Sequence, residues 1–229
     1  MSTSKKKTLT GGFSLLELLI AMAITMTLMT AAATLLASAL RMRNRENQKS
    51  DALADTQRAL NIMSREIANT GFNLTNNGIV ASDSGPNQLR IRSNLNRFDY
   101  SVEYDDDDRS RVQNEEEDIK YFLNETEMTK YLVRHDKYGT RSTVLANRID
   151  SLNIHYFDQK VTYTAPPGGS DITDVSAPEV APTDAKFIVI VIGVTLDAVG
   201  TPNTAGYQPP YSVLLCTDVT LRNSELWRY

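Results

Sequence analysis

The sequence predicts an α+β protein in which one long N-terminal α-helix packs on a C-terminal antiparallel β-sheet head. Three observations predict this fold. Residues 13–40 are almost wholly apolar, with Glu17 as their only ionisable side chain. No proline or glycine occurs between residues 13 and 70, so a single helix can continue without a break. After Gly71 the pattern changes to short β-branched and aromatic segments separated by turn residues, which is typical of strands.

The first twelve residues form a basic leader in front of the apolar run. Lys5, Lys6 and Lys7 carry its charge, and the leader contains no acid. The candidate cleavage point, after Gly12, comes before the apolar run, whereas an ordinary secretory signal is cut after its apolar core. Removal of residues 1–12 would therefore leave the apolar helix on the mature chain.

The apolar run, residues 13–40, is long enough to cross a membrane. As a helix rising ~1.5 Å per residue it would extend about 42 Å, against a hydrocarbon core of about 30 Å. The lysines of the leader place the N-terminus in the cytoplasm by the positive-inside rule. Arg41, Arg43 and Arg45 oppose that orientation, but large trailing domains translocate largely regardless of such charges. We therefore expect a single-pass helix with a cytoplasmic N-terminus.

Glu17 is the unusual residue of this helix, because a carboxylate within hydrocarbon costs about 3 kcal/mol unless it finds a partner. Cleavage between Gly12 and Phe13 would create an α-amino group four residues before the acid. The carboxylate could pair with that amine in its own chain or in a neighbouring subunit, and the second pairing would favour one axial stagger between helices. The alternative is an acid that snorkels near the start of the helix.

The segment KTLTGGFSLLELLIAMAI, residues 7–24, resembles the cleavage and methylation segment of type IV prepilins. The resemblance implies that a prepilin peptidase cuts the bond between Gly12 and Phe13 and methylates the new amino group of Phe13. It implies that Glu17 acts in subunit recruitment and register. It also implies a pilin-like fold and a place in the inner membrane with the head in the periplasm, followed by a place in a pilus on the surface of a Gram-negative-type bacterium.

Residues 41–69 continue the helix as a charged rod with one apolar stripe. Leu53, Leu60 and Ile67 recur every seven residues and Met63 lies between them, which predicts a seam packed on the chain's own head rather than a separate groove for a partner. Gly71 predicts a left-handed stop at the end of the helix.

A second resemblance concerns the subclass of pilin. Residues 57–72 and 217–223 are similar to PilW-like minor pilins, and less closely to J-type minor pseudopilins of type II secretion. The first resemblance implies a subunit that assembles into, primes or caps a type IV pilus, with other major and minor pilins and a tip adhesin as partners and with membrane lipid around it before assembly. Pilus-based adhesion and motility are the processes it would serve. The alternatives are a minor pseudopilin and, from a different class, a membrane-anchored periplasmic enzyme or binding module.

Residues 70–229 are expected to form the head. The apolar, β-branched run at 187–197 predicts a central strand covered on both faces and paired antiparallel with 211–222. Residues 105–118 contain eight acids and predict a solvated loop, and residues 165–184, rich in proline and glycine, predict a loop that is mobile or wraps the surface. The other predicted strands are 89–93, 98–104, 119–124, 130–134, 142–147 and 149–157.

The sequence offers few residues for catalysis. His135 and His155 occur in no zinc-binding spacing, and neither a nucleophile-elbow motif nor a phosphate-binding glycine loop is present. Cys216, the only cysteine, excludes an intramolecular disulfide and lies in an apolar run, which predicts a core thiol rather than a nucleophile activated by His155. We therefore expect no enzymatic activity and no required cofactor.

Ca²⁺ is the one metal that the sequence raises. Asp105, Asp106, Asp107 and Asp108 offer hard oxygen ligands, but the run lacks the ligand order and the glycine of an EF-hand, and a solvated acidic loop is the favoured alternative. The formal net charge of −4 conceals a net of −8 in residues 70–229, which disfavours a nucleic-acid-binding surface.

Overall fold

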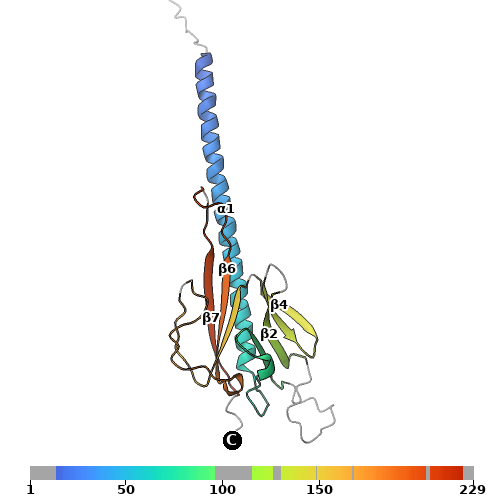
Figure 1. Ribbon diagram of the computed structural model, residues 1–229. Helices are drawn as coiled ribbons and strands as arrows, with labels where there is room; N and C mark the ends of the chain where they lie inside the picture. Colours follow the sequence, from blue (N-terminus) through green and yellow to red (C-terminus); the bar gives the residue numbers. More distant parts are fainter. Residues whose placement is uncertain are drawn as a thin grey trace, which may run out of the picture.

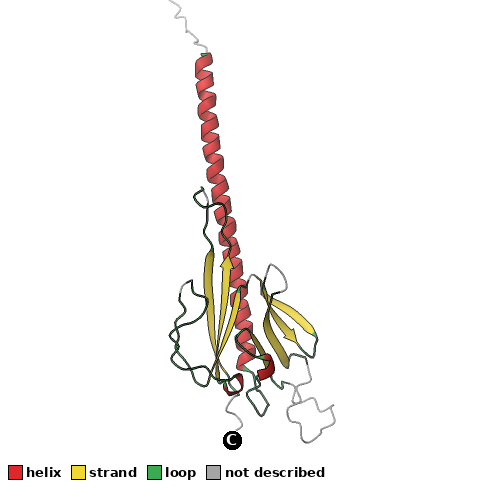
Figure 2. Cartoon of the chain, viewed as in Figure 1, coloured by secondary structure: helices red, strands yellow, loops and turns green. Residues whose placement is uncertain are grey.

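A single helix dominates the computed structural model, which describes residues 14–95, 115–125, 130–147, 149–166, 168–204 and 207–223. The helix α1 (Leu15–Ala68) has 54 residues, about 81 Å at ~1.5 Å per residue. Its first half projects from the head, and the strands lie beside its second half (Figures 1 and 2). The predicted combination of a long helix with a β-rich head is confirmed.

The two halves of α1 have opposite environments. Every described side chain from Ser14 to Asn44 is exposed, apart from the half-buried Ser38. From Arg45 onward one side of the helix is buried against the head. The buried helix residues are Arg45, Ala52, Thr56, Ala59, Leu60, Met63 and Ile67.

The predicted seam is confirmed at Leu60, Met63 and Ile67, each of which is at most 5% exposed. Leu53 is only half-buried, while Ala52 is buried. The buried positions follow the 3.6-residue period of the helix rather than a strict seven-residue repeat, and this leaves Leu53 at the edge of the buried face.

The C-terminal end of α1 is closed by two separate parts of the chain. Asn69 is its C-cap residue, and Gly71 has φ of +79°, as expected for the predicted left-handed stop. The side-chain amide of Asn223, beyond the last strand, donates to the carbonyl oxygens of Asn69 at 3.2 Å and Thr70 at 3.3 Å. The terminal segment of the head thus satisfies carbonyl groups that the helix leaves without partners.

The first sheet has four antiparallel strands in the order β1-β2-β3-β4. The second has three, in the order β5-β6-β7, and β6 pairs antiparallel with β7 as predicted. The predicted strand at 98–104 lies outside the described residues. The bounds are β1 (Gln88–Arg92), β2 (Asp118–Asn124), β3 (Tyr131–Asp136), β4 (Arg141–Asn147), β5 (Ser151–Phe157), β6 (Phe187–Leu196) and β7 (Tyr211–Thr220).

The head therefore has two sheets where the sequence analysis expected one. The chain changes sheets between β4 and β5. The amide of Ile149 still donates to Lys130 beside the first sheet, at 3.2 Å, whereas the amide of Asp150 donates to Gly193 in β6, at 2.9 Å. Ile149 is fully buried at this step, and α1 contacts β4 of the first sheet and β6 and β7 of the second. The helix thus joins the two sheets into one head.

Strand β6 is buried on both faces, as predicted. Ile188, Ile190 and Ile192 belong to the main core with the seam of α1. Val189 and Val191 belong to a second cluster on the opposite, outer face of the sheet. That face is covered by the described residues of the connection from β5 to β6, 158–166 and 168–186, which we call the strap. The strap includes the predicted loop at 165–184 and the 3₁₀ turn η2 (Pro182–Asp184), and it places Ile172 and Val175 on the outer face.

Candidate functional site

The first half of α1 exposes a long apolar surface. An 18-residue window of this helix has a mean hydropathy of 2.0, and none of it is buried in the chain itself. By length and composition α1 is the one helix, among the residues that the structure describes, that could cross a membrane. Large apolar side chains are exposed all along it; Leu15, Met26, Met29 and Leu35 are each at least 70% exposed.

A capping box opens this helix. Ser14 is the N-cap residue, and its hydroxyl accepts a hydrogen bond from the amide of Leu16 at 3.3 Å. The carboxylate of Glu17 accepts from the amide of Ser14 at 3.1 Å. The acid therefore satisfies one of the free N–H groups of the first turn, and its charge lies at the positive end of the helix dipole. This local role adds to the alternatives that the sequence left open.

Arg45 joins the head to α1 at the point along the helix where burial begins. Arg45 is 6% exposed, and its guanidinium donates to the carbonyl oxygens of Leu196 at 3.3 Å and Pro209 at 2.7 Å, and also to that of Asp197. These three carbonyls lie at the end of β6 and in the connection to β7. Sequence analysis counted Arg45 only as one of three charges beside the apolar run. The spacing in the sequence carries no signal for this contact, which joins residues about 150 positions apart.

Replacing Arg45 with methionine is expected to lower the free energy of unfolding by about 2 kcal/mol, because three carbonyl groups lose a charged donor while the apolar stem remains. Hydrogen exchange of residues 197–204 and 207–210 should accelerate. Arg43→Met is the matched control, since Arg43 is exposed two residues away and its replacement should change the stability by less than about 0.5 kcal/mol. Equal losses in the two variants, measured by urea unfolding, would contradict the anchoring role of Arg45.

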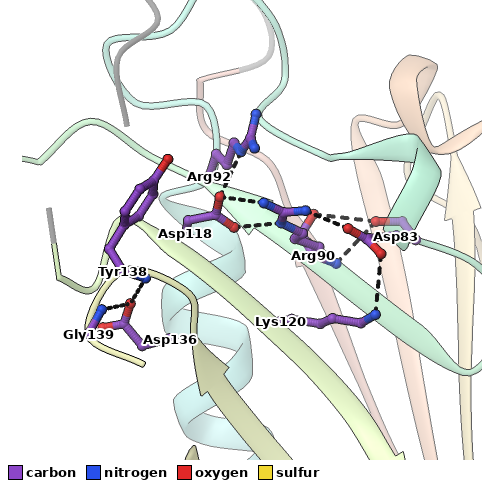
Figure 3. A network of polar contacts seen from close by, with 9 residues as sticks. Asp83, Arg90, Arg92, Asp118, Lys120, Asp136, Tyr138 and Gly139 are labelled. Carbon is purple, nitrogen blue, oxygen red and sulfur yellow. Dashed lines mark hydrogen bonds and ion pairs between the residues drawn. The ribbon is translucent and has the colours of Figure 1, made fainter. Parts of the chain in front are cut away.

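A buried ionic network holds the first sheet together (Figure 3). Asp118, fully buried on β2, accepts from Arg90 through both oxygens, at 2.7 and 2.8 Å, and from Arg92 at 2.9 Å. Arg90 also pairs with Asp83, which Lys120 approaches to 3.4 Å. Burial raises the pKa of Asp118, but the hydrogen bonds and charges of Arg90 and Arg92 outweigh this effect and hold the pKa below its ordinary value.

This network corrects the sequence analysis. Asp118 begins β2 and Glu117 is 1% exposed, so the end of the predicted acidic loop at 105–118 is buried in the head. The physical reason is that β1 supplies the compensating cations: Arg92 lies directly opposite Asp118 in the β1–β2 pair. A density of like charges argues against burial only when no opposite charges come from elsewhere in the chain.

A second buried acid organises the turns beside this network (Figure 3). Asp136, 4% exposed at the end of β3, accepts from the amides of Tyr138 and Gly139, each at 3.1 Å. Its other oxygen accepts from the amide of Glu116 at 2.7 Å. The carboxylate thus joins the β3–β4 turn to the chain that enters β2.

The helix is bound to the same sheet by Glu66. Its carboxylate accepts from the phenol of Tyr121 on β2 and from Nε of Arg134 on β3, at 3.0 and 3.2 Å. Burial, followed by the charge of Glu66, raises the pKa of Tyr121 well above its usual range, so the phenol remains a donor. These contacts place the second half of α1 against the first sheet.

Several predicted site residues lie outside the described residues. These are the leader lysines Lys5, Lys6 and Lys7, the processing residues Gly12 and Phe13, and the candidate Ca²⁺ ligands Asp105, Asp106, Asp107 and Asp108. Of the predicted assembly residues, the structure describes Glu17. Within the described ranges, no group of three or more His, Cys, Asp or Glu side chains could hold a metal ion.

The structure does not bring His155 and Cys216 together as a nucleophile and its base. They lie on β5 and β7, two strands that are about 9.5 Å apart because β6 lies between them, and Cys216 is level with Asn153 rather than with His155. Both ring nitrogens of His155 instead contact carboxylates, those of Asp171 and Glu179. Cys216 is half-buried in the outer-face cluster, and burial raises the pKa of its thiol.

No protein-family model, curated protein or solved structure matches this chain.

Proposed function

We propose that this chain is a minor type IV pilin, a structural subunit that a prepilin peptidase processes and that then assembles into, primes or caps a pilus. One observation carries the proposal. The apolar helix surface from residue 15 to residue 40 is wholly unpartnered apart from the half-buried Ser38, and its only ionisable side chain, Glu17, lies four residues after the expected new N-terminus.

An exposed surface of this kind must be covered. Burying one large apolar side chain contributes about 1.5–3 kcal/mol, so the projecting helix is stable in lipid or among other apolar helices but not in water. In the proposed cycle the helix lies in the inner membrane with the head in the periplasm. On assembly, neighbouring helices replace the lipid. Each subunit then contacts the next through a different surface, and such head-to-tail contacts do not close but extend as a helical filament.

Glu17 supplies the register in this proposal. A carboxylate among apolar helices favours the stagger that brings a neighbouring subunit's methylated amino group beside it, because other staggers leave both charges without partners. The head contributes a rigid end to the rod through Arg45 and Glu66, so a fixed stagger of the helices becomes a fixed rise between heads.

The mature mass tests the proposal directly. The mature chain isolated from membranes should lack residues 1–12 and carry one added methyl group on Phe13, as measured by intact-protein mass spectrometry. Gly12→Ala changes the residue before the expected cleavage point and should reduce processing. Lys137→Ala, a replacement in the head, should leave processing unchanged. A chain that retains its leader would contradict the proposal and would favour a membrane-anchored enzyme or binding module.

Deletion of the gene separates a pilus from a secretion system. Loss of surface pili with normal protein secretion is the outcome expected for a minor pilin. Loss of secretion with normal pili would instead assign the chain to a type II secretion pseudopilus.

A further inference from the structure

One histidine holds two points of the strap to the outer face of the second sheet through ionic contacts. His155, on β5, places Nε2 at 2.8 Å from Oδ1 of Asp171 and Nδ1 at 2.7 Å from Oε1 of Glu179. Both acids belong to the strap and are eight residues apart. A single imidazole therefore joins β5 to two points of the segment that covers the sheet.

The geometry at His155 fits its protonated form. A neutral imidazole carries one N–H and can donate to only one carboxylate, whereas an imidazolium donates from both nitrogens. The side chain of His155 is 15% exposed, and those of Asp171 and Glu179 are 38% and 55% exposed. The two carboxylates can thus reach water if the contact breaks, but the ring lies largely under the strap.

Other titratable groups face the same surface. Cys216 and Asp218 lie on β7, and Asp218 is opposite Val189, which is itself opposite His155. Tyr163 of the strap packs on the same cluster. Partial burial lowers the pKa of His155, but the hydrogen bonds and negative charges of Glu179 and Asp171 raise it by more, so the pKa lies above its ordinary value of 6.5.

The strap covers apolar surface where His155 holds it. Ile172 is 9% exposed and packs with Val189 and Val191 of β6, and Val175 and Ala177 pack at the margin of the same cluster. Neutral hydrogen bonds also hold the strap to β5: the side-chain amide of Asn153 donates to the carbonyl oxygen of Ser170 at 3.1 Å, and the backbone amide of Val180 donates to the carbonyl oxygen of Tyr156 at 2.9 Å. The ionic contact lies between these two attachments.

We propose that His155 is a proton-operated latch, whose protonated ring holds the middle of the strap on the outer face of the second sheet and whose deprotonation opens the apolar surface beneath. The latch is independent of the proposed function in a pilus. Because the pKa of His155 is higher in the folded chain than in the unfolded one, its stabilising contribution is complete below about pH 6.5 and is lost as the pH rises through the folded value.

Cys216 provides a reporter for the latch, since it is the only thiol of the chain and lies half-buried in the cluster at the edge of the strap. The full chain in detergent micelles is labelled with a disulfide reagent between about pH 6 and about pH 9. The measured quantity is the ratio of the labelling rate of His155→Gln to that of the wild type at each pH. Taking the ratio removes the intrinsic dependence of thiol reactivity on pH.

The expected ratio is about ten near pH 6, where the wild-type latch is closed, and falls to about one near pH 9, where it is open. His135→Gln is the matched control, because His135 lies on β3 in the other sheet and its ring is within hydrogen-bond distance of the hydroxyl of Ser142 rather than of the strap. Its ratio should stay near one throughout. Glu179→Gln provides a second variant, at a half-exposed position. Its labelling ratio should also fall as the pH rises, but over a smaller range. A ratio that does not change with pH for either variant would overturn the latch.

Discussion

Replacing Asp118 with alanine is expected to lower the free energy of unfolding of the head by about 3–5 kcal/mol, the typical cost of removing one partner from a buried ion pair. Asp118 is fully buried and accepts three hydrogen bonds from two guanidinium groups. Without it, Arg90 keeps a charge that is 7% exposed and has only Asp83 as an anionic partner among the described residues. Urea unfolding of the full chain in mild detergent, followed by near-ultraviolet circular dichroism, measures the loss.

Asp83→Ala is the matched control for this prediction, because Asp83 pairs with the same Arg90 but its side chain is 35% exposed. An exposed pair contributes little, so a loss below about 1 kcal/mol is expected. Lowering the pH should destabilise the head in the same way as Asp118→Ala. The pKa of Asp118 is lowered in the folded chain, so its contribution is present above its ordinary value of 3.8 and is lost as the pH falls through the folded value. Equal losses in the two variants would show that burial does not set the strength of this network.

The elements of the fold could be predicted from sequence because their signals are local. Each of the seven described strands begins and ends within two residues of its prediction, and the helix ends one residue before the predicted Asn69. β-branched runs, turn residues and an unbroken helical period act over neighbouring positions, and here tertiary contacts reinforce them.

The contacts that hold the candidate site could not be predicted in the same way. Arg45 reaches the β6–β7 connection, and Asp118 meets arginines 26 and 28 residues earlier in the chain. Such pairs depend on which strands lie side by side, which local composition does not reveal. The composition around Asp118 predicts the opposite of what is found, because a run of acids is typical of a solvated loop. Glu17 differs, because a serine followed three residues later by glutamate is a local signature of a capping box, one that the sequence analysis did not use.

Glu17→Gln separates the capping role of this acid from its proposed role in assembly. Glutamine at the third helical position can also accept from the amide of the N-cap residue, so the capping box formed with Ser14 should persist while the charge is lost. If the charge sets the register of the filament, incorporation into sheared filaments should fall about tenfold or more, as expected from the loss of several kcal/mol of pairing within an apolar environment. Glu17→Leu, which removes both cap and charge, should lose at least as much.

Ser14→Ala completes the comparison, because it removes the cap that accepts from Leu16 and leaves the charge of Glu17 in place. The cost of about 1 kcal/mol falls on the first turn of a helix that neighbouring helices would surround in the proposed filament, so near-normal incorporation is expected. The mature mass of each variant, measured in the membrane fraction, separates failed processing from failed assembly. Normal incorporation of Glu17→Gln together with loss in Ser14→Ala would mean that the acid serves the helix terminus alone, and the subunits would then need another source of register.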